Sequence, residues 1–305
     1  MKWRVKVLLV MHLAVLALPD SWYFRDLQRA AESNHRITPL TFSQMRSHLV
    51  DGRQEIYSED CDLGEVDAVL VRTMPPGSLE RVVFRMDLLA RLEAAGRVVI
   101  NPPRAIEAAV DKYLALAKLQ AAGLRVPETM VCQTADDAMQ AFDRLDRDVV
   151  IKPLFGGEGR GIARLQSENL AHGAFRLMER MESVIYLQRF VPHEGYDIRV
   201  LLIGQKVFTI RRCNPHDWRT NVSRGARAEP LEIDDEMLDL ARRAAAAIGA
   251  PIAGVDLLPG RDGKLYVLEV NAVPGWRALS KALDVDVARV TLDLVQTMVD
   301  SHPAR

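Results

Sequence analysis

Strand and helix patterns alternate along the first hundred residues. Residues 5–10 are apolar except for Lys6, which predicts a strand buried on both faces. Two amphipathic helices are predicted, one beginning after Asp20 and Ser21 and one after Ser78. Further strands are predicted at 36–42, 66–71 and 98–100. This alternation predicts an open parallel sheet of βαβ type over residues 1–101.

The remainder of the chain continues with helices and strands in a different order. Asn101 and the two prolines after it mark a boundary. A helix is predicted from Asp111 to about Gly123, and the other predicted helices are 134–145, 234–248 and 285–299. The predicted strands are 149–153, 186–191, 198–203, 207–211, 253–258 and 265–270. We expect an α/β protein with a small α+β lobe at 102–191 and a larger one at 192–305.

Composition and charge exclude several classes of protein. The chain has 305 residues, of which 49% are hydrophobic and 27% charged, as in an ordinary globular protein. Lys plus Arg (40) nearly equals Asp plus Glu (41), so no net charge attracts nucleic acid or an anionic membrane. No apolar stretch reaches the ~18–20 residues that span a bilayer. We therefore expect neither nucleic-acid nor membrane partners.

The N-terminal apolar run has two interpretations. Lys2 and Arg4 precede an apolar stretch at 7–18, as in the secretory signal of a secreted binding protein. However, His12 interrupts the stretch and no small-residue cleavage site precedes Pro19, which favours a buried first strand. The three cysteines are far apart and fit neither a disulfide framework nor a zinc site. A reducing, cytoplasmic location is therefore expected.

Four glycines lie within the six residues 156–161. The backbone N–H groups of such a loop can hold an anion, and Lys152 just upstream can act as a point charge on a phosphate. The loop lacks the Gly-Lys-Ser/Thr end of a Walker loop and the spacing of a Rossmann fingerprint. Phosphate binding and a mobile hairpin turn both remain open for this segment.

Two carboxylates are predicted to face each other near the C-terminus. Asp262 and Gly263 form a favoured two-residue hairpin turn, and a hairpin centred there pairs Asp256 with Glu269. Asn271 then projects from the same face. Facing carboxylates destabilise a sheet unless a cation or a proton lies between them. Three oxygen ligands suit Mg²⁺ or Mn²⁺, and the alternative is neutralisation by a nearby arginine.

Arginine and polar residues occur between these two motifs. Arg199 follows Asp197 at the start of an apolar strand, and Arg211 lies near the end of the next strand. For any one of these arginines taken alone, a solvated or structural role is the usual explanation. Beside a metal site, Arg199 and Arg211 are the residues we expect to clamp phosphate or carboxylate oxygens during catalysis.

In this order, the motifs resemble the ATP-grasp superfamily and, within it, the RimK-like amino-acid ligases. The resemblance extends over about residues 101–301 and rests most on Gly-Val-Asp at 254–256, Glu-Val-Asn at 269–271 and the pair Pro274 and Gly275. It implies ATP held between two lobes, with two Mg²⁺ or Mn²⁺ ions on Asp256, Glu269 and Asn271. The βαβ region is consistent with the first domain of that superfamily.

The resemblance also implies the residues that bind ATP. The hinge at 188–191 would contact adenine mainly through its backbone, and Asp197 would bind the ribose. Arg189 departs from the family, which often has Glu at this position. The full implied set is Lys112, Lys152, Gly156, Gly157, Gly159, Gln188, Arg189, Phe190, Asp197, Arg219, Thr220 and Asn221.

The implied reaction joins a carboxylate to an amine through an acylphosphate. L-glutamate would be added to a carboxylate acceptor, with a pterin coenzyme of the tetrahydromethanopterin type as the favoured acceptor. The alternatives are a ligase that modifies a protein tail or an amino-carrier protein, and a non-catalytic ATP-binding sensor or scaffold. The strand-end segments 11–20 and 72–77 are candidates for acceptor recognition. Assembly as a homo-oligomer is left open.

Overall fold

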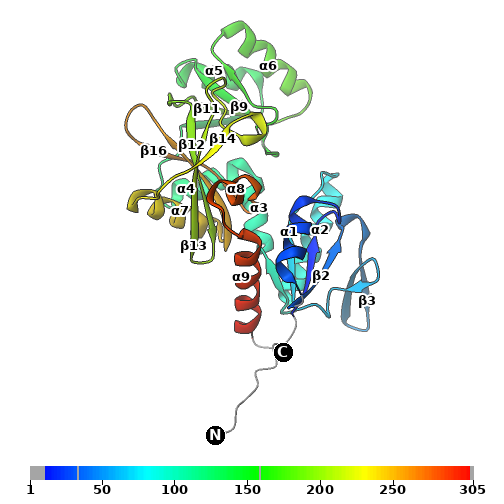
Figure 1. Cartoon of the computed structure of the whole chain (residues 1–305). Helices are drawn as coiled ribbons and strands as arrows, with labels where there is room; N and C mark the ends of the chain where they lie inside the picture. The colour runs from blue at the N-terminus through cyan, green and yellow to red at the C-terminus, as the bar shows by residue number, and fades with distance from the viewer. Residues whose placement is uncertain (1–10, 33, 158, 303–305) are drawn as a thin grey trace.

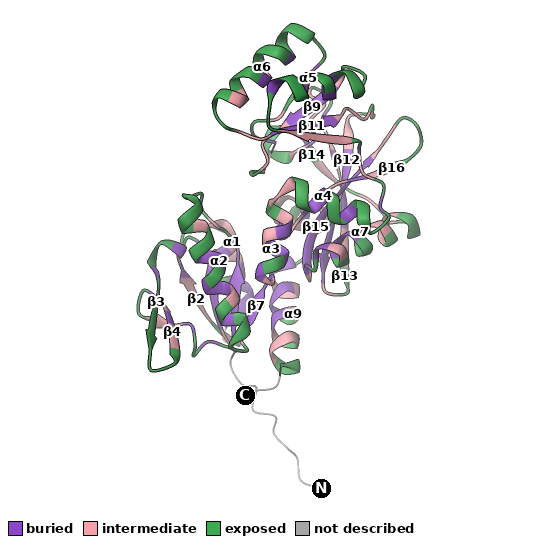
Figure 2. Ribbon diagram, turned by 180° about the vertical axis from the view of Figure 1, so that it is seen from behind, coloured by how far each residue is buried: buried purple, intermediate pink, exposed green. Residues whose placement is uncertain are grey.

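The computed structural model describes residues 11–32, 34–157 and 159–302. Three sheets with their helices make up three parts, which are visible in Figure 1 as an N-terminal domain, a small lobe and a large lobe. Buried residues concentrate on the strands and on the inner faces of the helices (Figure 2). None of the described helices is both long enough and apolar enough to cross a membrane.

The N-terminal domain is a parallel sheet with the strand order β2-β1-β6-β7. Its predicted helix starts are confirmed, because Ser21 Oγ accepts from the Phe24 N–H and Ser78 Oγ from the Arg81 N–H. The predicted strand at 5–10 lies outside the described residues, and the same apolar run continues into β1. The elements are β1 (Met11–Leu16), α1 (Trp22–Ala31), β2 (His35–Leu40), η1 (Phe42–Gln44), β6 (Ala68–Val71), α2 (Leu79–Ala94) and β7 (Val98–Ile100).

A small antiparallel sheet between β2 and β6 was not predicted. It contains β3 (Met45–Val50), β4 (Arg53–Ser58) and β5 (Cys61–Asp62). Both faces of the hairpin carry exposed or half-buried side chains, so the alternation that reveals a strand is weak. The available signal was the turn Asp51-Gly52, where both residues have positive φ, as a two-residue hairpin turn requires.

The small lobe is an antiparallel sheet with two helices packed on it. Its core includes Phe142 and Phe175, whose rings meet edge to face with their centroids 6.3 Å apart. β9 ends at Lys152, so the sheet brings this lysine to the edge of the lobe. The elements are β8 (Thr129–Cys132), α5 (Ala135–Arg144), β9 (Val149–Lys152), β10 (Ala163–Leu165), α6 (Glu168–Arg180) and β11 (Ile185–Arg189).

The large lobe is an antiparallel sheet with the strand order β14-β13-β12-β15-β16. Helices cover both faces: α3, α4 and α7 contact β15 or β16, whereas α8 contacts β13 and β14. The strands are β12 (Tyr196–Ile203), β13 (Lys206–Cys213), β14 (Arg227–Pro230), β15 (Ile252–Pro259) and β16 (Leu265–Asn271). The helices are α3 (Pro103–Val110), α4 (Lys112–Ala121), η2 (Val222–Arg224), α7 (Asp235–Ile248), α8 (Arg277–Leu283) and α9 (Val287–Ser301).

The structure changes the expected boundaries between the three parts. α3 and α4, which we had placed in the small lobe at 102–191, pack on α7 and β16 of the large lobe. The C-terminal helix α9 packs against α1 and β7, so it covers the N-terminal sheet as well as β12. Apolar helix faces predict that a helix is buried, but they do not identify the sheet that buries it, which explains this error.

Asn101 joins the N-terminal domain to the large lobe. Its side chain is 2% exposed, donates to the carbonyls of Ile252 (2.7 Å) and Ala272, and accepts from the Ile252 N–H (3.0 Å). Asn101, which the sequence marked as a domain boundary, thus connects the N-terminal domain through buried hydrogen bonds to β15 and to the segment after β16.

We expect Asn101→Ala to lower the free energy of unfolding by about 2–4 kcal/mol, because it leaves buried backbone groups of Ile252 and Ala272 without partners. Denaturant unfolding measures the change. Asn34→Ala is the matched control, since Asn34 is exposed, and a change under about 0.5 kcal/mol is expected there. Equal effects of the two substitutions would contradict the assigned role of Asn101.

Candidate functional site

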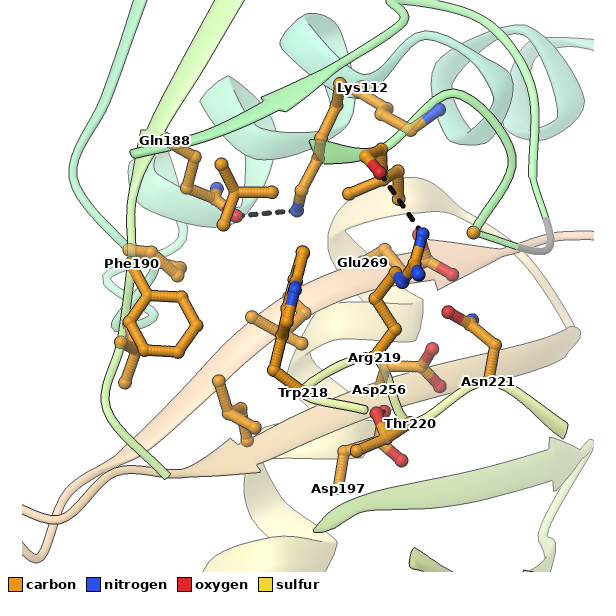
Figure 3. Close-up of a pocket in the computed structure, with 18 of the residues that line it drawn as sticks. Lys112, Gln188, Phe190, Asp197, Trp218, Arg219, Thr220, Asn221, Asp256 and Glu269 are labelled. Carbon is orange, nitrogen blue, oxygen red and sulfur yellow. Dashed lines mark hydrogen bonds between the residues drawn. The ribbon is translucent and has the colours of Figure 1, made fainter. Parts of the chain in front are cut away.

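A pocket opens between the small lobe and the large lobe (Figure 3). Residues of β9, β11, the glycine-rich loop, the 218–221 segment, β15 and β16 line it. Among the predicted site residues, the following line the pocket: Lys112, Lys152, Gly156, Gly157, Gly159, Gln188, Arg189, Phe190, Asp197, Arg219, Thr220, Asn221, Asp256 and Glu269. The fold therefore brings residues from position 112 to position 269 into one cleft.

Two lysines reach the pocket, Lys152 from the end of β9 in the small lobe and Lys112 from the start of α4 in the large lobe. Lys152 Nζ donates to Gln188 Oε1 at 2.6 Å, and the Gln188 amide in turn donates to Thr129 Oγ1 at 3.0 Å. Lys112, at the start of α4, donates to the Gly156 carbonyl at 2.5 Å. Burial lowers the pKa of Lys152 to about 8, against the opposing effect of Glu269. Lys152 is thus a desolvated cation that a bound anion would stabilise.

The glycine-rich loop lies against the large lobe. Gly159 has φ +69°, and a β-carbon placed on it would lie 2.6 Å from Asn221 Oδ1. The Arg224 guanidinium donates to the Gly159 carbonyl at 3.0 Å. By contrast, a β-carbon on Gly157 would have no neighbour within 4 Å. Glycine is therefore required at 159 both by the backbone conformation and by the close approach of Asn221.

The predicted pairing of Asp256 with Glu269 across β15 and β16 is confirmed, although the predicted turn is wrong. Near the turn, Pro259 pairs with Leu265, which leaves a five-residue loop at 260–264 instead of two residues. A register shift between Asp256 and Leu257 then adds one residue on β16. This bulge restores the expected register, so the two carboxylates face each other.

Asp256 is held by two arginines. It is 3% exposed; Arg199 donates to both of its oxygens, and Arg212 approaches Oδ2 at 2.8 Å. Burial alone would raise the pKa of Asp256, but the two guanidinium groups outweigh it and lower the pKa to about 2. Arg212 also donates to Asp197, which accepts from Thr220 Oγ1 at 2.6 Å. The ribose contact expected of Asp197 stays a prediction.

Glu269 differs from Asp256 in having no hydrogen-bond partner among the described residues. Burial raises the pKa of Glu269, the facing Asp256 raises it further, and Arg199, Lys152 and Lys112 oppose both. Glu269 faces the pocket together with Asp256 (Figure 3). Its carboxylate is thus available to a cation that enters the cleft.

The donor set fits a magnesium-type ion in its chemistry. Glu269 has free oxygens, and Asn271 Oδ1 accepts one bond, from the Val273 N–H at 2.8 Å, which leaves it a second lone pair. No three His, Cys, Asp or Glu residues cluster in the described ranges, so the site would consist of two carboxylates and one amide. Asp256 Oδ2 accepts from both guanidinium groups, whereas Oδ1 accepts only from Arg199, which leaves Oδ1 a second lone pair for an ion.

The expectation for Arg211 is corrected to Arg212. The Arg211 side chain is 43% exposed and pairs with Glu229 at 2.7 Å, outside the pocket. Adjacent strand residues point to opposite faces, so Arg212 and not Arg211 faces Asp197 and Asp256. The sequence contained a signal for Arg212. If Asp197 points into the cleft, its buried carboxylate needs a cation at the facing position of the next strand, and Arg212 occupies that position.

The aromatic wall of the pocket includes one residue that sequence reasoning missed. The Trp218 ring meets the Phe190 ring edge to face, with the centroids 5.9 Å apart, and both line the pocket. The Arg164 guanidinium lies 3.5 Å from the centre of the Phe190 ring. Such a wall suits the flat, apolar base of a nucleotide.

Arg189 directs its guanidinium toward two acidic side chains of the small lobe. It pairs with Glu128 at 2.7 Å and also with Asp146, while its backbone N–H donates to the Glu128 carbonyl at 2.8 Å. The residue that departs from the family pattern is thus engaged within its own lobe.

Comparison with known proteins identifies similar chains. A family model described as the RimK-like ATP-grasp domain matches residues 109–295. The chain is 31% identical to tetrahydromethanopterin:alpha-L-glutamate ligase of Methanosarcina acetivorans over 92% of this chain and 97% of that protein. It is also 31% identical to alpha-aminoadipate–LysW ligase LysX of Sulfurisphaera tokodaii, over 58% of this chain and 64% of that protein.

Solved structures agree on the fold. The ATP-grasp ligase PsnB complexed with a minimal precursor superposes with a TM-score of 0.75 at 25% identity, covering 94% of this chain and 99% of that one. A RimK domain protein of Sphaerobacter thermophilus gives a TM-score of 0.72 at 23% identity, with 93% and 98% coverage.

We expect Gly159→Ala to weaken ATP binding at least about tenfold, because the new methyl group is strained at this φ and meets Asn221. Calorimetric titration with ATP measures the change. Gly157→Ala is the matched control in the same loop and should change affinity by less than about twofold. If the two variants lost affinity equally, close contact at 159 would not be the reason for the glycine.

The affinity for ATP should fall as the pH rises through about 8 in the free protein. Lys152 is charged below that pKa and neutral above it. Burial and the nearby Lys112 lower the pKa of Lys152, whereas Glu269 and Asp256 raise it. Lys152→Arg keeps the charge at high pH, so its affinity should stay level from about pH 7.5 to about pH 9.5. Identical pH profiles for both proteins would exclude Lys152 as the titrating group.

Proposed function

This chain belongs to the RimK-like ATP-grasp family, and we propose that it adds L-glutamate to a carboxylate acceptor. It is an ATP-grasp ligase, an enzyme class that uses ATP and Mg²⁺. The observation that carries the proposal is the cleft in which Lys112, Lys152 and the glycine-rich loop face the Asp256–Glu269 pair. A cytoplasmic location stays a prediction.

The site supplies what phosphoryl transfer to a carboxylate needs, which is positioning and charge neutralisation. A carboxylate oxygen of the acceptor attacks the γ-phosphorus of ATP, and the bond from that phosphorus to the ADP oxygen breaks. Lys112, Lys152 and Arg219 would bind the phosphate oxygens, and Arg199 would bind the acylphosphate. No serine or cysteine nucleophile is required.

The second half of the reaction forms the amide bond. The amine nitrogen of glutamate attacks the acyl carbon, the bond from that carbon to the phosphate oxygen breaks, and inorganic phosphate leaves. The proton lost by the amine passes to phosphate or solvent. Asp256, Glu269 and Asn271 would hold two Mg²⁺ or Mn²⁺ ions, which would neutralise phosphate charge when bound.

A pterin coenzyme is the acceptor that the relatives favour. The tetrahydromethanopterin:alpha-L-glutamate ligase matches along 92% of this chain, whereas the LysX ligase, whose name gives a LysW acceptor, matches along 58%. The N-terminal domain, which we expect to recognise the acceptor, is thus included in the match to the pterin ligase. Ligation to a carrier protein is the competing proposal.

A panel assay tests the function. The purified protein is incubated with ATP, Mg²⁺ and L-glutamate, and with tetrahydromethanopterin, an amino-carrier protein or no acceptor. ADP release and a mass gain of one glutamyl residue on the pterin are the expected results. A gain only on the carrier protein would favour the competing ligase, and ATP binding without ADP release from any mixture would contradict ligase activity.

Glu269→Gln should lower ATP-dependent turnover at least about a hundredfold, because the amide removes the one carboxylate of the pair that has free oxygens. ADP release with saturating substrates measures it. Glu229→Gln is the matched control, since Glu229 pairs with Arg211 outside the pocket. Full turnover by the Glu269 variant would refute the assignment of the metal ligands.

A further inference from the structure

Arg72 is a buried cation that no carboxylate of the described residues neutralises. It directly follows β6 and is 8% exposed. One guanidinium nitrogen, Nη2, donates to the Pro274 carbonyl at 2.8 Å, while the buried Nε has no hydrogen-bond partner. Burial lowers the pKa of Arg72 to about 10, with Tyr23 as the one opposing group. A carbonyl oxygen accepts a hydrogen bond but does not balance the charge.

Two aromatic rings surround the guanidinium. Its central carbon lies 4.1 Å from the centre of the Trp276 ring and 5.0 Å from that of Tyr23. The two rings are themselves in edge contact, with centroids 5.1 Å apart. Cation–π contacts offset part of the cost of burying a charge, but they supply no counterion. The guanidinium is therefore left with its charge unbalanced among the described residues.

Arg72 lies where the N-terminal domain meets the strand of the predicted metal ligands. The segment 272–276 directly follows Asn271, the last residue of β16. It is closely packed on both sides: a β-carbon on Gly254 would lie 2.9 Å from Pro274 Cβ, and one on Gly275 would lie 2.5 Å from Tyr23 Oη. This explains why the sequence has glycines at these two positions.

The same place is the carboxyl end of the parallel strands. The N–H groups of Arg72 and Thr73 both donate to the Leu16 carbonyl, so the ends of β1 and β6 meet here. Ligands of open α/β sheets bind at this edge. Tyr23 Oη makes no hydrogen bond with any described residue, and its ring contacts both the Arg72 guanidinium and the Trp276 ring.

We propose that Arg72, assisted by Tyr23 Oη, binds a carboxylate group of one of the two organic substrates. This inference rests on the proposed function and extends it to the recognition of those substrates. Nε and the remaining N–H groups of the guanidinium form the planar donor set that a carboxylate accepts in a bidentate manner. The carboxylate belongs either to the acceptor or to L-glutamate, and both are anionic.

The test compares Arg72→Gln and Arg72→Lys with the wild-type enzyme. Glutamine keeps a donor for Pro274 but removes the charge, and lysine keeps the charge without the planar donor set. We expect Arg72→Gln to raise KM at least about tenfold for one substrate, tetrahydromethanopterin or L-glutamate, and to leave KM for ATP within about twofold. Arg72→Lys should restore part of the loss. The substrate whose KM rises identifies the source of the carboxylate.

Arg85→Gln is the matched control. Arg85 is also buried, also donates to a backbone carbonyl, that of Pro75 at 2.7 Å, and also lies over an aromatic ring, that of Phe42. It does not contact the 272–276 segment. This variant should lower Tm and leave all three KM values unchanged.

A fall in kcat with every KM unchanged would overturn the inference, because it would mean that Arg72 only holds the segment after β16. If the wild-type enzyme fails to turn over any substrate pair, the proposed function fails. A binding measurement then tests separately whether Arg72 binds a carboxylate. L-Glutamate and the dicarboxylate glutarate are then titrated into the protein without ATP. Binding that Arg72→Gln abolishes supports the site, and absence of binding to the wild-type protein overturns it.

Discussion

The facing of Asp256 and Glu269 across β15 and β16 is the constraint on which the site depends. Two carboxylates on opposed strand positions repel each other, so the fold has to supply positive charge at that point. Arg199 and Arg212 pair directly with Asp256, whereas no cation among the described residues pairs with Glu269. The pair is therefore half neutralised by the protein, and the remaining charge is directed into the cleft.

Opposite charges face each other across the cleft. The small lobe contributes Lys152 at the end of β9, and the large lobe contributes Lys112 at the start of α4 as well as the carboxylates. Contacts between Gly159 and Asn221 and between Arg224 and the Gly159 carbonyl hold the loop over the opening. A polyanion that carries divalent cations matches both walls at once, which neither a free anion nor a free cation does.

Much of this arrangement was predictable, because it follows from local rules. Capping serines located α1 and α2, and apolar runs located the buried strands. Most of the expected site residues came from the resemblance to the ATP-grasp superfamily. The facing carboxylates were predicted from a two-residue turn that does not exist, and a bulge near Asp256 compensated for the error. Counting outward from an assumed turn therefore gives the correct strand pairing only when the register shift from a wrong loop length is offset by a bulge.

Features that depend on tertiary contacts were not predictable. The choice between Arg211 and Arg212 depends on which face of β13 meets the cleft, and the packing of α3 and α4 on the large lobe depends on which apolar faces meet. The surroundings of Arg72 were not predictable for the same reason, because Tyr23 and Trp276, which pack on its guanidinium, lie some 250 residues apart in the sequence. Residue spacing carries no information about such contacts.

The most direct measurement is a crystal structure of the protein with Mn²⁺ and a non-hydrolysable ATP analogue, in which anomalous scattering locates the metal. The account predicts manganese between the analogue's phosphates and the carboxylates of Asp256 and Glu269. An analogue bound elsewhere, or an analogue in the cleft with no metal at Glu269, would contradict it.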